Sequence, residues 1–291
     1  MLEDFKNLFR GGNFIGQIVI INAIVFLADN IITNFSAGAG AEIMRWFAMH
    51  PFLPTFLTSP WSAVTYMFFH GGFSHIFWNM VLLYWFGKII HDFMGKKRLI
   101  WVYFLGGISG AMFYLGIKSI EYLSGEIIAD VPLIGASAGI MALVSLAGFR
   151  FGDYKLNMLF IGQVPLKYVA LAIFIMNTVL DFNFNTGGKM AHLGGAAFGF
   201  FYHRSLGKGK DLITTINDLF EQFKGLFARK PRMRIVVDDD KHSARPVKSD
   251  MQLKAEIQAK TNAILDKISK SGYENLSKEE KEFLFKLSNK N

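Results

Sequence analysis

Apolar residues along this chain gather into six long runs, and short polar or glycine-rich segments separate them. The runs span residues 14–32, 61–90, 99–117, 133–149, 165–182 and 189–202. A helix that crosses the roughly 30 Å hydrocarbon core of a bilayer needs about 20 predominantly apolar residues. The pattern therefore predicts an all-α fold, a polytopic membrane bundle of six transmembrane helices. The first run is longer than a signal-peptide core and lacks a small-residue cleavage site, so we expect it to remain as a span.

The segments outside the runs predict how the rest of the chain is organised. Residues 1–13 mix Phe and Leu with charges, which is typical of a short interfacial segment. Residues 34–60 are rich in Gly, Pro and polar residues and predict a loop half sunk in the membrane interface. We expect the membrane core to occupy 14–205. After it we expect an amphipathic helix over 206–230, a linker over 231–250 and a small helical tail over 251–291.

The expected tail carries two further helical patterns, over 251–270 and 277–287. Ser277 precedes Glu280 by three residues, the spacing of a capping box at the start of a helix. The apolar stripe of the two segments suffices for a helical hairpin, but it offers no second active site.

Composition supports a membrane protein. Hydrophobic residues make up 52% of the 291 residues, and 30 of them are Phe, more apolar surface than one soluble core would hide. The chain has no cysteine, which excludes disulfides and thiol chemistry.

The formal net charge is +8, and the distribution of the basic residues along the chain indicates their role. They lie in short segments between runs and in the tail, where the cytoplasmic membrane surface attracts them. We therefore expect both termini in the cytoplasm and no nucleic-acid partner. The basic residues expected inside the core's cytoplasmic segments are Lys96, Lys97, Arg98, Arg150, Lys155, Arg204, Lys208 and Lys210, and those expected outside are Arg45, Lys118 and Lys189.

A candidate nucleophile lies near the start of the fourth run, in residues 135–140, which read G-A-S-A-G-I. The motif places the hydroxyl of Ser137 among small residues, about one helical turn inside the predicted span. Small residues also allow membrane helices to pack closely, and on the motif alone packing is the stronger interpretation. A catalytic role needs a base at the same depth.

His192 supplies a candidate base, because it lies near the outer end of the sixth run as Ser137 does in the fourth. Small residues recur every four positions around it, at Ala191, Gly195 and Gly199. We expect this stripe to pack against Gly135 and Gly139, close enough for a Ser–His hydrogen bond.

The second run adds three polar residues at a similar level. His75 and Asn79 are four residues apart and share one helical face. His70 lies off that face and belongs to the entry turn before the helix. Ionisable residues inside a membrane are costly and usually functional, so the convergence favours a catalytic site over packing.

Together these pieces make the chain resemble the rhomboid family of intramembrane serine proteases. The matching pieces are His70, His75 and Asn79 in the second run, G-A-S-A-G-I in the fourth, and Gly187-x-x-x-Ala191-His192-x-x-Gly195 in the sixth. The resemblance implies that Ser137 is the nucleophile and His192 its base. It also implies that His75, Asn79 and the Ser137 backbone N–H stabilise the oxyanion, with His70, Gly135 and Met141 as supporting residues.

The resemblance further implies substrates that are transmembrane proteins, cut near the outer surface of the bilayer, with no cofactor and no metal. The tail resembles those of some bacterial rhomboid-like proteins, so we expect a multi-pass protein of the bacterial cytoplasmic (inner) membrane. The oligomeric state is left open.

The sequence departs from the family pattern at three positions. We expect these departures to affect the efficiency of catalysis more than the type of reaction. Ala138 stands where the family most often has Gly, Ser62 replaces the arginine of a Trp-Arg loop motif, and Met141 replaces an aromatic that packs on the base. Methionine contacts an imidazole through its sulfur but orients the ring less rigidly.

Two other functions and one further residue stay open. The first is a catalytically inactive rhomboid-like protein that binds client proteins, although such relatives typically lack the nucleophile or base that is present here. A haem-binding electron carrier would use paired histidines, for which His91 and His203 are the candidates. Asp181 could approach His192 as a third catalytic member, although an exposed carboxylate at a helix end is the stronger interpretation.

Overall fold

The computed structural model describes residues 13–158, 162–179, 186–227 and 250–288. The chain divides into two compact units, Met1–Ala228 and Arg229–Asn291. The predicted segment 1–13, apart from Asn13, and the predicted linker up to residue 249 lie outside the described residues.

The structure is mostly helical, and two of the described helices are long and apolar enough to cross a membrane. These are α2, Phe14–Phe35, and α7, Lys96–Leu123. The side chain of Asn13 caps α2 by accepting a hydrogen bond from the Ile15 N–H at 3.1 Å, which fixes the start of the first run. Shorter apolar helices cover the fourth and fifth runs.

The region between the first and third runs is more helical than the sequence predicts. The predicted interfacial loop contains α3, Ala37–Phe47, and α4, Leu53–Thr58. The second run is interrupted: it begins with the short helices α5, Ser62–Thr65, and η1, Tyr66–Phe68, and continues as α6 over Phe73–Met94. Gly71 and Gly72 separate the two parts, because glycine favours turns over continued helix.

The last three runs form α8, α9 with η2, and α10. Helix α8 spans Ser137–Arg150 and α10 spans Thr186–Gly207. Helix α9, Leu166–Phe174, continues directly into the π-helical turn η2, Ile175–Val179.

The described residues also contain one short β-hairpin, which the sequence analysis does not predict. Strands β1, Lys155–Met158, and β2, Gly162–Pro165, pair antiparallel with Lys155 opposite Pro165. Exposed Lys155 and Asn157 alternate with half-buried Leu156 and Met158, the two-residue period of a strand with one covered face.

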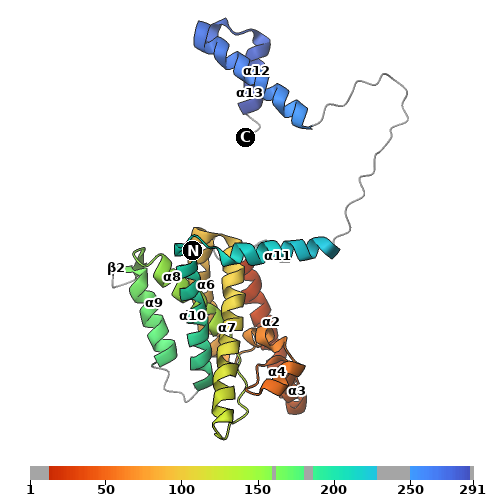
Figure 1. Ribbon diagram of the computed structural model, residues 1–291, viewed down its shortest axis with the longest axis vertical. Helices are drawn as coiled ribbons and strands as arrows, with labels where there is room; N and C mark the ends of the chain where they lie inside the picture. Colours follow the sequence, from red (N-terminus) through yellow and green to blue (C-terminus); the bar gives the residue numbers. More distant parts are fainter. Residues whose placement is uncertain (1–12, 159–161, 180–185, 228–249, 289–291) are drawn as a thin grey trace, which may run out of the picture. The chain divides into compact units, whose positions relative to one another are not determined.

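Helix α8 packs against four helices of the first unit, α6, α7, α9 and α10 (Figure 1). Nine of its 14 residues are buried, on every side of the helix, as expected for a core helix. A methyl group added at Gly195 of α10 would overlap the carbonyl oxygen of Ala138, and Gly199 faces Ala142 in the same way. The α8 and α10 backbones are therefore in direct contact.

This contact corrects one detail of the predicted packing. Ala138 and Ala142 face the α10 stripe, whereas Gly139 faces the Tyr103 carbonyl of α7 and Gly135 faces His75. The alanines are four residues apart and share a face of α8, so the small stripe of α10 packs on their side of the helix.

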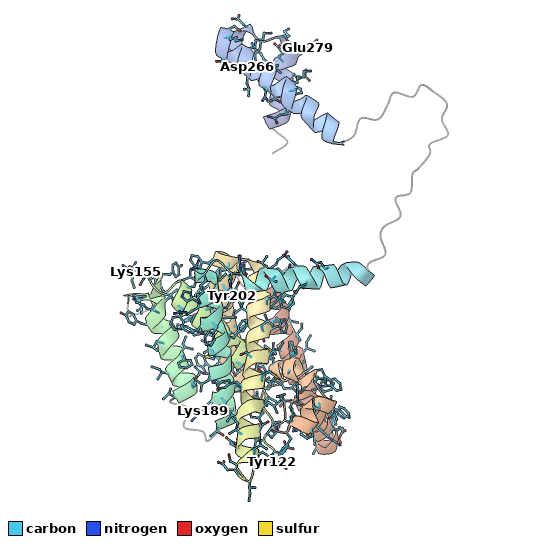
Figure 2. All side chains as sticks on the ribbon, in the orientation of Figure 1. Tyr122, Lys155, Lys189, Tyr202, Asp266 and Glu279 are labelled. Carbon is cyan, nitrogen blue, oxygen red and sulfur yellow. The ribbon has the colours of Figure 1, made fainter. Side chains whose placement is uncertain are left out.

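The first unit has two distinct ends (Figure 2). Tyr122 and Lys189 lie at one end, called here the lower end, and Lys155 and Tyr202 lie at the other, the upper end. Helix α11, Leu212–Phe227, contacts α7 and α10 at the upper end. Ile213 of α11 is buried, whereas Leu212 and Leu219 are about half exposed. The predicted amphipathic helix thus covers part of the core through Ile213.

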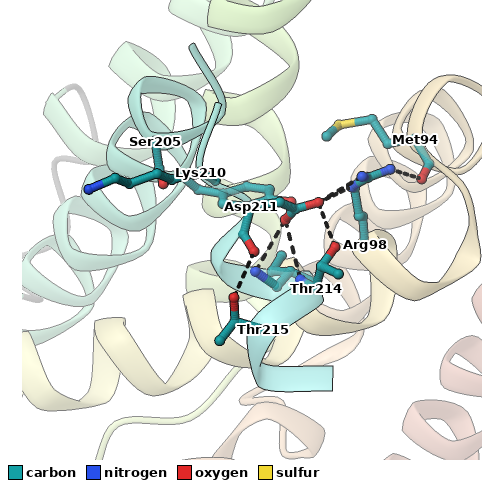
Figure 3. A network of polar contacts seen from close by, with 9 residues as sticks. Met94, Arg98, Ser205, Lys210, Asp211, Thr214 and Thr215 are labelled. Atoms are coloured by element: carbon teal, nitrogen blue, oxygen red, sulfur yellow. Dashed lines mark hydrogen bonds and ion pairs between the residues drawn. The ribbon is translucent and has the colours of Figure 1, made fainter. Parts of the chain in front are cut away.

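Asp211 joins α11 to the upper ends of α7 and α10 (Figure 3). Its carboxylate accepts hydrogen bonds from Arg98 Nη2 at 2.7 Å, Tyr202 Oη at 2.8 Å and Thr214 Oγ1 at 2.8 Å. The Ile213 N–H also donates to it at 3.2 Å, so Asp211 caps α11 as well.

The second unit contains α12, Asp250–Ser271, the turn η3, Tyr273–Asn275, and α13, Lys278–Ser288. The predicted capping box is present: Ser277 N–H donates to Glu280 at 2.7 Å and Glu280 N–H donates to Ser277 Oγ at 3.2 Å. The Ser277 N–H bond and then the Lys267 bond to the carboxylate lower the pKa of Glu280. The Lys267 bond, at 2.9 Å, also ties the two helices together.

Candidate functional site

Ser137 is the first residue of α8, and the turn before it determines where its hydroxyl lies. Gly135 has a φ of +120°, which residues with a side chain rarely adopt, and its N–H donates to the Tyr66 carbonyl at 3.0 Å. A helix cannot continue through this conformation. The helix of the fourth run therefore starts at Ser137 and not at Leu133, where the predicted span begins. Ser137 thus occupies the helix N-terminus, where the first backbone N–H groups have no acceptor within the helix.

The structure brings Ser137 and His192 together. Ser137 Oγ lies 2.7 Å from His192 Nε2, across the contact between α8 and α10. His192 Nδ1 lies 2.9 Å from the carbonyl oxygen of Asn177. A carbonyl only accepts, so Nδ1 carries the proton, and in the neutral ring Nε2 is left as the acceptor for the serine hydroxyl.

Asn177 is the residue that sequence reasoning missed. It lies in η2, where the helix widens to a π-turn, and its main chain rather than its side chain contacts the base. The one visible signal was an asparagine within the apolar fifth run. Asp181, the predicted alternative, lies outside the described residues.

His75 and Asn79 project from α6 toward the same region. The Gly71 N–H donates to His75 Nδ1 at 3.3 Å, so in the neutral ring the proton lies on Nε2. A methyl group at Gly135 would come within 2.8 Å of Nε2 and 3.7 Å of Ser137 Oγ, which places that N–H beside the nucleophile. Asn79 is buried and donates one amide hydrogen to the His75 carbonyl at 2.8 Å, which leaves its second amide hydrogen for a ligand.

The three supporting residues occupy different places. His70 precedes α6, as expected of the entry turn, and its buried ring packs edge-on against His75 with centroids 5.0 Å apart. Met141 is buried one turn below Ser137 and lines the cavity at the site. Gly135 supplies the turn and leaves room for His75.

A cavity of about 870 Å³ opens over these groups. It is lined by residues of the α6 entry turn, α6, α8, η2 and α10, including Gly71, His75, Asn79, Ser137, Asn177 and His192. Such a volume accommodates several residues of an extended peptide together with water, and the polar groups converge on one side of it.

The two histidines of the haem alternative, His91 and His203, each contact another residue. His91 lies at the end of α6 beside Asp92, with 3.4 Å between Nδ1 and the carboxylate. His203 instead stacks on Phe149, with ring centroids 6.0 Å apart. Among the described residues, no group of three His, Asp or Glu side chains is arranged to hold a metal ion.

Comparison with known proteins identifies the family to which this chain is similar. The model of the "Rhomboid domain" matches residues 57–209, and that of a "Family of unknown function (DUF6576)" matches 252–290. "RHOMBOID-like protein 12, mitochondrial" of Arabidopsis thaliana is 30% identical over 159 residues, covering 50% of this chain and 46% of that protein. "Putative rhomboid protease YdcA" of Bacillus subtilis (strain 168) is 29% identical over 146 residues, 48% of this chain and 64% of that protein.

The human "Presenilin-associated rhomboid-like protein, mitochondrial" is 26% identical over 222 residues, 73% of this chain and 54% of that protein. The chain thus spans less than two thirds of the length of these relatives. The domain match covers more than half of the chain and includes every candidate site residue from His70 to His192. This chain therefore belongs to the rhomboid family, whose members are embedded in membranes.

Proposed function

We propose that this protein is an intramembrane serine endopeptidase that hydrolyses peptide bonds in or near transmembrane segments of membrane proteins. The observation that carries the proposal is the 2.7 Å contact between Ser137 Oγ and His192 Nε2, with His192 Nδ1 bonded to a carbonyl. Family membership supports it, and one of the relatives has a name that describes a rhomboid protease.

In the proposed reaction, His192 Nε2 takes the Ser137 proton as Oγ attacks the carbonyl carbon of the scissile bond. The oxyanion that forms lies near the His75 Nε2–H, the free Asn79 amide hydrogen and the backbone N–H groups at the α8 N-terminus. His192 then returns the proton to the leaving amine, and water from the cavity hydrolyses the acyl-enzyme.

The membrane arrangement is part of the proposal. Six spans would place both termini in the cytoplasm of a bacterium, with the site near the outer surface of the inner membrane. The basic residues support this orientation. Lys155 and Arg98, which pairs with Asp211 just before α11, lie at the upper end, the proposed cytoplasmic side. Lys189 lies at the lower end, near the start of α10.

The test uses a fluorophosphonate probe and a model transmembrane substrate, with the purified protein in detergent. The wild-type protein is expected to be labelled and to cleave the substrate, and Ser137→Ala and His192→Ala are each expected to abolish cleavage. Because the two residues act as one unit, the double variant should lose no more than either single one.

Ser145→Ala is the matched control. Ser145 lies two turns further along α8 and donates to the Ala196 carbonyl at 2.8 Å, so it contacts α10 without facing the cavity. It should remain labelled and active. A folded wild-type protein that binds transmembrane clients but is neither labelled nor active would instead be an inactive client-binding relative.

A further inference from the structure

The segment that leads into the nucleophile is held by the loop between α3 and α4. Met49 and Leu133 form an isolated antiparallel bridge, with Leu133 N–H to Met49 O at 2.8 Å and Met49 N–H to Leu133 O at 3.1 Å. Tyr114 Oη of α7 donates to the Val131 carbonyl at 2.8 Å. Leu133 and the next residue, Ile134, line the site cavity, and Ser137 is four residues beyond the bridge.

A pair of side chains next to the Met49–Leu133 bridge links the same two segments. His50 Nδ1 lies 2.8 Å from Asp130 Oδ1, although the two residues are 80 positions apart. The His50 side chain is only 11% exposed, and its Nε2 lies 3.4 Å from the Met44 carbonyl. The ring thus faces an acceptor on each side, and when both nitrogens carry protons it donates to both and pairs with the carboxylate charge.

The loop that provides His50 is itself fixed to the body of the first unit. Trp61 Nε1 donates to the Trp46 carbonyl at 2.9 Å, and Thr65 Oγ1 donates to the Phe47 carbonyl at 2.7 Å. Met49 is fully buried. His50 therefore projects from a loop anchored by these bonds, and its bond to Asp130 connects that loop to the segment before α8.

We propose that His50 and Asp130 are positioning residues that hold residues 130–136 so that the Gly135 turn presents Ser137 to His192 and His75. The inference rests on the proposed protease function for its catalytic consequence. The pair touches neither the substrate nor the reacting atoms. It acts through the Met49–Leu133 bridge on the cavity wall, where a displacement of about 1 Å costs up to two orders of magnitude in rate.

The variants His50→Ala, Asp130→Ala and their double are compared in detergent by probe-labelling rate and by kcat and KM on the model substrate. Each single variant should lower the labelling rate and kcat about tenfold, and the double should lose about the same tenfold rather than a hundredfold, because one contact is removed in each case. Asp130→Asn keeps an acceptor of the same shape and should recover most of the rate.

His91→Ala is the matched control, since His91 also lies beside an aspartate but is half exposed at the end of α6. Hydrogen exchange provides a readout that needs no activity: His50→Ala should speed exchange of the Leu133 and Gly135 amides, whereas His91→Ala should not. Unchanged exchange in a folded His50→Ala protein would overturn the inference, and so would multiplicative losses in the double variant. A wild-type protein that is never labelled would overturn the proposed protease function, and the exchange result would still decide the role of the pair.

Discussion

At the scale of single residues, the unusual feature is that the main chain orients the base. In a Ser-His-Asp triad a carboxylate holds the histidine tautomer, and replacing it costs about 10⁴ in kcat. Here the Asn177 carbonyl occupies that position, 2.9 Å from His192 Nδ1. A carbonyl adds no full negative charge to stabilise the imidazolium, but its position depends on the η2 backbone and not on any one side chain.

This difference predicts that Asn177→Ala will keep most of the activity. The Asn177 side chain donates to the Ile173 carbonyl one turn earlier at 2.8 Å, and its removal leaves the main-chain carbonyl in place. We expect kcat to stay within about threefold of the wild type, because the tautomer of His192 is preserved. The measurement is kcat on the model substrate, with His192→Ala as the inactive reference. A loss of a thousandfold in a folded protein would show that the side chain takes part.

At the scale of elements, the sequence predicts positions along a helix better than it predicts where a helix begins. Similar depths for Ser137 and His192 were predicted from the ends of two apolar runs. The structure places Ser137 Oγ 2.7 Å from His192 Nε2. The start of α8 did not follow, because the apolar run continues through Gly135 while the backbone there turns to a φ of +120°.

Contacts made by main-chain groups were the hardest to predict from the sequence. The Asn177 carbonyl bond to His192 depends on the π-turn η2, and the strand pairing of Met49 with Leu133 joins single residues of two loops. Both contacts depend on the backbone, so the folded arrangement is needed to reveal them. The Asp211 network at the start of α11 was missed for a related reason, since its main partner Arg98 lies 113 residues away.

Asp211 predicts a stability loss at acid pH. Burial alone would raise its pKa, but the bonds from Arg98, Tyr202 and Thr214 outweigh burial and lower the pKa to about 2, below the ordinary value of 3.8. A lowered folded-state pKa stabilises the protein above about pH 4, and this contribution is lost as the pH falls from about 4 to 2.

Asp211→Asn should remove this contribution and lower stability at neutral pH by about 1.5–3 kcal/mol, the range for a hydrogen bond to a charged group. The check is thermal unfolding in detergent from pH 2 to 7, in which the gap between wild type and variant should close toward pH 2. Asp153→Asn is the control, because the Asp153 side chain is 93% exposed beside Lys167 and such pairs contribute little. A gap that is the same at every pH would mean that the charge of Asp211 is not what stabilises α11.

At the scale of the whole molecule, the chemistry and the tail belong to different units. Every candidate site residue lies in Met1–Ala228, and the Rhomboid domain match ends at residue 209. The second unit matches a separate family over 252–290, and its helices are joined by their own contacts, such as the Lys267–Glu280 ion pair. Helix α11 belongs with the first unit, since Asp211 binds Arg98 and Tyr202 there.

Two truncations test this division. Ending the chain after Ile235 keeps α11 and removes α12 and α13, so cleavage of the model substrate in detergent should stay within about twofold of the full chain. Ending it after Leu206 also removes Asp211 and the buried Ile213, and should lower thermal stability while the folded fraction still reacts with the probe. Melting temperature and the labelled fraction, measured on the same samples, separate the two effects. If the protein ending at Ile235 is folded but inactive, α12 and α13 contribute to catalysis and the division of the chain is wrong.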